Sequence, residues 1–82
     1  MGDRGGIVMK RQCYDLKYDG EADRWMVHIG NYSYGLHCGE CFELRIGNKS
    51  IPCRLEYDDA WYVIMHDTRF NLRTRSTYKA KV

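Results

Sequence analysis

Apolar and polar residues alternate along most of this chain with a period of two, the spacing of a β-strand that buries one face. Trp25, Val27 and Ile29 show the alternation clearly, with Arg24 and His28 on the opposite face. No stretch keeps the helical period of about 3.6 residues for more than two turns. The pattern predicts strands over residues 7–14, 24–29, 41–46, 51–57, 61–65 and 72–82.

Turn-forming residues separate the predicted strands. Asp19-Gly20, Gly47-Asn48 and Asp58-Asp59 favour tight turns, and residues 30–39 have the composition of a loop. Pro52 has no amide hydrogen, so its strand should begin there, bulge there or lie at an edge of the sheet. No internal repeat is evident. We predict one all-β domain over residues 7–82, an antiparallel sheet or partly open barrel of five to six short strands, after a disordered Gly-rich stretch over residues 1–6.

The size of the chain bears on its stability. A domain of 82 residues buries only about 60% of the surface that its unfolded chain exposes. Small domains of this kind often add a disulfide, a metal ion or a partner. The chain has four cysteines, Cys13, Cys38, Cys41 and Cys53, and a C-x-x-C step presents two thiolates from one turn. The sequence therefore predicts a structural zinc ion held by these four residues.

Two other interpretations of the cysteines stay open. Cys13 and Cys53 can be small buried hydrophobic residues, since Cys53 alternates in phase with Ile51 and Leu55. A redox pair at Cys38 and Cys41 is the third interpretation, although such pairs normally open a helix. His37 is beside Cys38 and can replace one thiolate as a ligand.

Charge and aromatic residues suggest a binding surface. The net charge is only +2, but residues 68–82 contain five basic residues and no acidic one. Arg69, Arg73 and Arg75, together with the loop residues Tyr32 and Tyr34, are candidates for contacts with a large protein partner. The alternative is a nucleic-acid-binding module that uses the basic C-terminal strand. An ordinary edge strand that lysine and arginine protect from aggregation accounts equally for this composition.

Catalysis has little support in the sequence. No Gly-x-Ser-x-Gly elbow and no Gly-rich phosphate loop occurs, and the three histidines share no short spacing. We therefore expect no enzyme. The sequence has no signal peptide and no membrane-spanning segment, so we expect a cytoplasmic protein whose thiols stay reduced.

The central segment resembles a known family. Residues 35–44, Gly-Leu-His-Cys-Gly-Glu-Cys-Phe-Glu-Leu, followed by residues 51–57 and 61–64, are similar to a small domain-of-unknown-function family carried by Gram-positive bacteria, their phages and mobile elements. In that family threonine often stands at the position of Cys53. The resemblance implies mobile-element biology in a bacterial host cell. It suggests a small anti-CRISPR protein that binds a type II CRISPR effector nuclease, and it carries over no functional residue.

Overall fold

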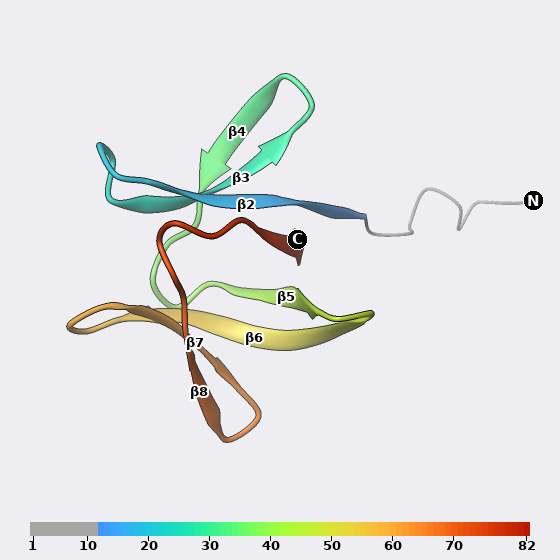
Figure 1. Cartoon of the computed structure of the whole chain (residues 1–82), viewed down its shortest axis with the longest axis vertical. Coiled ribbons are helices and arrows are strands. Elements are labelled where there is room, and N and C mark those ends of the chain that lie inside the picture. The colour runs from blue at the N-terminus through green and yellow to red at the C-terminus, as the bar shows by residue number, and fades with distance from the viewer. Residues whose placement is uncertain (1–11) are drawn as a thin grey trace, which may run out of the picture.

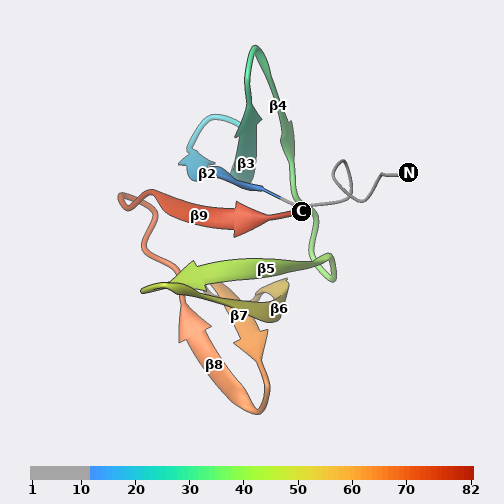
Figure 2. The ribbon, with the colours of Figure 1, turned by 90° about the vertical axis from the view of Figure 1, so that its right-hand side faces the viewer.

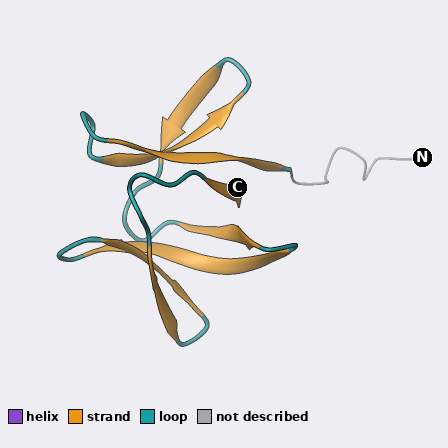
Figure 3. Ribbon diagram, viewed as in Figure 1, coloured by secondary structure: helices purple, strands orange, loops and turns teal. Residues whose placement is uncertain are grey.

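The structure, a computed structural model, describes residues 12–82 as a sheet of antiparallel strands (Figure 1). The strands are β2 (Cys13–Asp19), β3 (Arg24–Ile29), β4 (Tyr32–Gly35), β5 (Cys41–Ile46), β6 (Lys49–Tyr57), β7 (Trp61–Met65), β8 (Thr68–Asn71) and β9 (Tyr78–Lys81). Their order in the sheet is β4-β3-β2-β9-β5-β6-β7-β8. The described residues form no helix, so none of them belongs to a helix that can cross a membrane (Figure 3).

The predicted all-β antiparallel class is confirmed, but the strand count is wrong. The described residues contain eight strands, not five to six, and the sheet is open because its end strands β4 and β8 do not pair with each other. β4 lies within residues 30–39, for which the sequence predicts a loop. β8 lies before the strand predicted over residues 72–82, and only β9 forms within that range. The predicted disorder over residues 1–6, and the first part of the predicted strand over residues 7–14, lie outside the described residues.

Pro52 occupies a place where β6 has one neighbour. β6 pairs with β5 from Lys49 to Arg54, and its pairing with β7 begins only at Arg54. Pro52 is paired with Glu43 of β5, and the β7 side of the strand is open at that point. The missing amide hydrogen therefore removes no bond to β7, as expected for proline at a local edge.

The sheet consists of two copies of one four-stranded unit, although no internal repeat is evident in the sequence. β2-β3-β4-β5 corresponds to β6-β7-β8-β9, and exchanging the two sets reverses the strand order and leaves it otherwise unchanged. Leu36 N donates to Trp25 O at 2.9 Å, and Leu72 N donates to Trp61 O at 3.0 Å. These equivalent residues are separated by 36 positions in the sequence. An approximate twofold axis therefore relates the two halves.

The two repeats exchange their last strands. β5, the last strand of the first repeat, pairs with β6, and β9, the last strand of the second repeat, pairs with β2 (Figure 2). β5 and β9 also pair with each other, with Leu44 opposite its equivalent Ala80, and both side chains are fully buried. Neither repeat can complete its own part of the sheet without a strand of the other.

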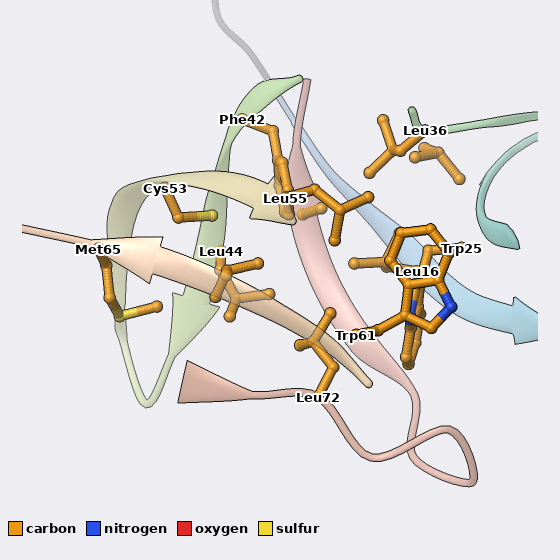
Figure 4. Packing of buried hydrophobic residues seen from close by; sticks show 13 residues of the cluster. Leu16, Trp25, Leu36, Phe42, Leu44, Cys53, Leu55, Trp61, Met65 and Leu72 are labelled. Atoms are coloured by element: carbon orange, nitrogen blue, oxygen red, sulfur yellow. The ribbon is translucent and has the colours of Figure 1, made fainter. Parts of the chain in front are cut away.

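One apolar core serves both repeats (Figure 4). The buried side chains form one cluster and come from both halves: Leu16, Trp25, Val27, Leu36, Phe42, Leu44, Cys53, Leu55, Trp61, Val63, Met65, Leu72 and Ala80. Most of them alternate along their strands, so the period of two predicted the core face correctly for β3, β5, β6 and β7. The shared core implies that the two repeats unfold together.

A bond between the repeats forms at the β2–β3 turn. Asp23 has φ 53°, a left-handed conformation that aspartate tolerates better than most residues. Its carboxylate accepts hydrogen bonds from the hydroxyl of Tyr18 and from Nε1 of Trp61, the latter at 3.2 Å. The equivalent indole nitrogen, that of the buried Trp25, has no hydrogen-bond acceptor within the described part of the chain. Asp23 thus satisfies one of the two tryptophans and joins the first repeat to the second.

The equivalent core leucines test whether the repeats unfold as one unit. Leu16 and Leu55 are both fully buried, so Leu16→Ala and Leu55→Ala should each lower the free energy of unfolding by about 3 kcal/mol. Urea unfolding followed by tryptophan fluorescence and by far-ultraviolet circular dichroism should give one coincident transition for each variant. Two separate transitions in either variant would contradict the shared core.

Acid should weaken the bond between the repeats. Hydrogen bonds from Tyr18 and Trp61 lower the pKa of Asp23 below its ordinary value, so this contribution to stability is present above the pKa of the unfolded chain and is lost as pH falls through the lower, folded pKa. Asp23→Asn should lower the melting temperature at pH 7 and flatten its decline below about pH 4. Asp67→Asn, at an exposed residue of another turn, is the control. An unchanged acid profile in Asp23→Asn would contradict this role.

Candidate interaction surface and the cysteine turn

The register of the β5–β6 hairpin separates two of the predicted zinc ligands. Cys53 is paired with Phe42 and is buried in the core, with 6% of its surface exposed. Cys41, the neighbour of Phe42, is paired with Arg54 and is exposed. Because successive side chains of a strand point to opposite faces, Cys41 and Cys53 lie on opposite sides of the sheet. One metal ion cannot reach both without a change of register.

The Cys38-Gly39 step is a turn closed by hydrogen bonds. Glu40 N donates to His37 O at 3.1 Å, and the side chain of Glu40 accepts a bond from His37 N at 2.7 Å. Gly39 has φ 90°, which a residue with a Cβ rarely adopts, so glycine permits this turn. The same backbone bond recurs in the second repeat, where Ser76 N donates to Arg73 O at 3.0 Å. The turn is therefore a feature of the repeat, and its second copy contains no cysteine.

The remaining candidate ligands are also dispersed. Cys13 is half-buried at the start of β2, and its sulfur lies 3.7 Å from Nη1 of Arg45. His37 is exposed, and its Nδ1 lies 3.1 Å from Nη1 of Arg24. Across residues 12–82, no three His, Cys, Asp or Glu side chains form a group that can hold a metal ion. The four-cysteine zinc site stays a prediction from the sequence, and the arrangement of the strands does not support it.

Thiol labelling separates the interpretations of the cysteines. Burial raises the pKa of Cys53 to about 12, so this thiol is protonated at neutral pH and shielded by the core. Cys38 and Cys41 are exposed. A maleimide added to the native protein at pH 7 should modify these two quickly and Cys53 only on unfolding, as read by mass spectrometry of peptides. A zinc ion held by all four residues predicts instead that none reacts until a chelator is added.

Tyr32 and Tyr34, the tyrosines predicted to contact a partner, lie on the β3–β4 hairpin at one end of the sheet (Figure 1). Tyr32 has 63% of its surface exposed, the largest value among the exposed bulky hydrophobic residues of the described chain. Tyr34 is half-buried and packs against the core. Desolvation by burial, with a further contribution from the nearby charge of Glu40, raises the pKa of Tyr34. Tyr32 is thus available for contacts, and Tyr34 anchors the hairpin.

Arg69 lies at the other end of the sheet and is already engaged. Its Nη atoms donate to both carboxylate oxygens of Asp58, at 3.0 and 3.1 Å, and Nε donates to Asn71 at 3.1 Å. Its guanidinium also lies 3.7 Å from the centre of the Tyr62 ring. A side chain held by three groups has few donors left for a partner. Arg69 therefore belongs to the structure of β8.

The predicted arginines and tyrosines do not form one surface. Arg73 and Arg75 are exposed in the loop from β8 to β9, where the backbone N of Arg73 donates to the hydroxyl of Tyr78 at 2.9 Å. Tyr32 lies on the strand at the opposite end of the sheet. A partner that contacts the tyrosines therefore approaches a different end of the sheet from one that contacts Arg69.

The basic C-terminal strand has acidic neighbours. β9 lies inside the sheet between β2 and β5, so it is not the edge strand that its composition suggested. Lys79 forms an ion pair with Asp15 of β2 at 2.5 Å, and Lys81 is paired in register with Glu43 of β5. Acidic groups thus interrupt the positive charge, which reduces the attraction of this strand for a phosphate backbone.

Two further residues of this surface were not predicted from the sequence. Ser33 and Gly35 belong to the edge strand β4, and the side chain of Arg24 lies across Gly35. A Cβ built on Gly35 would lie 2.9 Å from Cδ of Arg24, so the absence of a side chain at Gly35 leaves room for the Arg24 side chain. The alternation of Tyr32 and Tyr34 with small residues was the available signal, but the turn-like composition of residues 30–39 obscured it.

The fold and this surface define a small, open, all-β domain built from two repeats. A family model described as a domain of unknown function (DUF5348) matches residues 14–82, and the chain belongs to this family. The chain is also similar to a crystal structure of a protein from Ruminococcus gnavus, with a TM-score of 0.71 and 29% sequence identity. That match covers 87% of this chain and 100% of the other. No curated protein matches the chain.

Proposed function

We propose that this protein is a non-catalytic module that binds another protein through the end of the sheet formed by the β3–β4 hairpin. The observation that carries the proposal is an edge strand without a charged residue, Tyr32-Ser33-Tyr34-Gly35, whose first side chain is the most exposed bulky hydrophobic residue described. Proteins usually protect such edges with charge, proline or a covering segment. An edge left open is consistent with pairing to a partner.

The aromatic side chains fit this use. Tyrosine supplies a large apolar surface and a polar tip while restricting few rotatable bonds, which is why it is enriched at protein interfaces. Tyr34 is anchored in the core, so the hairpin is held rigidly before binding and less conformational entropy is lost on docking.

Photo-crosslinking from tyrosine positions tests the proposal. A benzoylphenylalanine at position 32, expressed in the native host cell and irradiated, should give a crosslink to a second protein. The matched control is position 57, because Tyr57 is 48% exposed and contacts Trp61 in the second repeat, at a ring-centroid distance of 4.8 Å. Equal crosslinking from both positions, or none from position 32, would reject this binding end.

The narrower function, inhibition of a type II CRISPR effector nuclease, stays a prediction from the sequence resemblance. It supposes that the partner of the module is such a nuclease. The direct assay adds the purified protein to the loaded nuclease and measures cleavage of its target DNA. This assay is independent of the position 32 crosslink, so the general and the narrower proposals can fail separately.

A further inference from the structure

We propose that the partner binds by adding an extended, acidic strand to the edge of β4. This inference rests on the proposed function and specifies its mode. Leu36 directly follows β4, and its N donates to Trp25 O of β3. In the β3–β4 register, Leu36 is therefore a residue whose backbone groups face β3, and the residues of β4 alternate from there. Because successive residues of a strand turn their backbone groups to opposite sides, those of Tyr32 and Tyr34 face β3. The N–H and C=O groups of Ser33 and Gly35 therefore point away from the sheet and are the groups available to a new strand.

The second repeat provides an internal comparison. β8 is the equivalent end strand, and Arg69 and Asn71 occupy the positions of Ser33 and Gly35. Arg69 is fixed there by Asp58, Asn71 and Tyr62, so a charged side chain stands beside the outward backbone groups of β8. Charged residues at such positions oppose pairing with another chain. The same fold thus protects one edge and leaves the other unprotected.

Arg24 indicates the charge of the partner strand. Its side chain extends over Gly35, and its Nη1 is within 3.1 Å of the ring Nδ1 of His37. Among residues 12–82, Arg24 has no carboxylate partner within ion-pair distance. A strand added at Gly35 brings its side chains close to this guanidinium, where an aspartate or glutamate would form a charge-assisted hydrogen bond.

The same charge argues against a second copy of this chain as the occupant. β4 itself contains no acidic residue, so pairing β4 with β4 of another copy would place no carboxylate of that strand opposite Arg24. Two copies of Arg24 near one edge would instead repel each other. An acidic extended segment of another protein is the occupant that the surface favours.

A labelled peptide measures this binding directly. The probe is fluorescein-Thr-Val-Glu-Val-Thr-Val-Thr, whose valines extend the tyrosine face of β4 and whose glutamate is on the face of Arg24. The comparison peptide has lysine in place of glutamate. The full chain should bind the glutamate peptide in fluorescence anisotropy, and the lysine peptide at least about fivefold more weakly. No binding of either peptide up to about 1 mM would overturn the proposal.

Three variants identify which groups of the chain bind the peptide. Ser33→Pro removes the outward amide hydrogen and, because that group faces away from β3, leaves the hairpin ladder in place; it should weaken binding at least about tenfold. Ser33→Thr keeps the amide and should bind within about twofold of the original. Arg24→Gln should bind both peptides about equally. Unchanged affinity in Ser33→Pro would overturn edge pairing, and an unchanged preference in Arg24→Gln would overturn the role of that charge.

Hydrogen exchange gives a readout that does not depend on the folding of a variant. Saturating glutamate peptide should slow exchange of the amides of Ser33 and Gly35 at least about tenfold and leave those of Arg69 and Asn71 unchanged.

A dimer in sedimentation without peptide, abolished by Ser33→Pro, would show that a second copy occupies the edge and would overturn the proposal. A position 32 crosslink that persists in Ser33→Pro would keep the binding function and reject only its mode.

Discussion

The pairing of β5 with β9 is the interaction on which the fold depends. At this seam Leu44 meets Ala80, its equivalent in the other repeat, and each strand also pairs with a strand of the opposite repeat. Both residues are fully buried, so the seam contributes apolar burial as well as backbone hydrogen bonds. Without it, β5 and β9 would each lose one neighbour, the sheet would divide into β4-β3-β2-β9 and β5-β6-β7-β8, and only side-chain contacts such as the bond from Trp61 to Asp23 would join the two parts.

The shared core also bears on how a chain of this size is stable. A short domain buries a small fraction of its surface, which is one reason why the sequence predicted a structural zinc ion. In the structure the two repeats pool their apolar residues in one cluster that includes Cys53. The C-x-x-C turn is closed by backbone and carboxylate hydrogen bonds that need no ligand. Gly39 supplies the left-handed backbone conformation that this turn adopts.

Local patterns predicted the strands with alternating large residues and failed where tertiary pairing decided the structure. β3, β5, β6 and β7 follow their alternation, and the hairpin turn at Gly47-Asn48 is where it was expected. β4 and β8 have only four residues each, and their glycine, serine and asparagine gave a loop-like composition. The placement of Cys53 in the core and of Arg69 on Asp58 depends on which strands become neighbours. Tyr32 was identified from its residue type, whereas the outward backbone of Ser33 became visible only from the register.

The long-range pairing of β2 has a consequence for how the protein reaches its native state in the cell. Residues 13–16 pair with residues 78–81, so this ladder joins segments that are separated by nearly the whole described chain. During translation β2 leaves the ribosome long before β9 exists, and one side of it stays without its native neighbour in the meantime. Such distant contacts also slow folding after synthesis. The nascent chain therefore exposes a second temporary edge, on β2, that a chaperone or another nascent chain can occupy until β9 arrives.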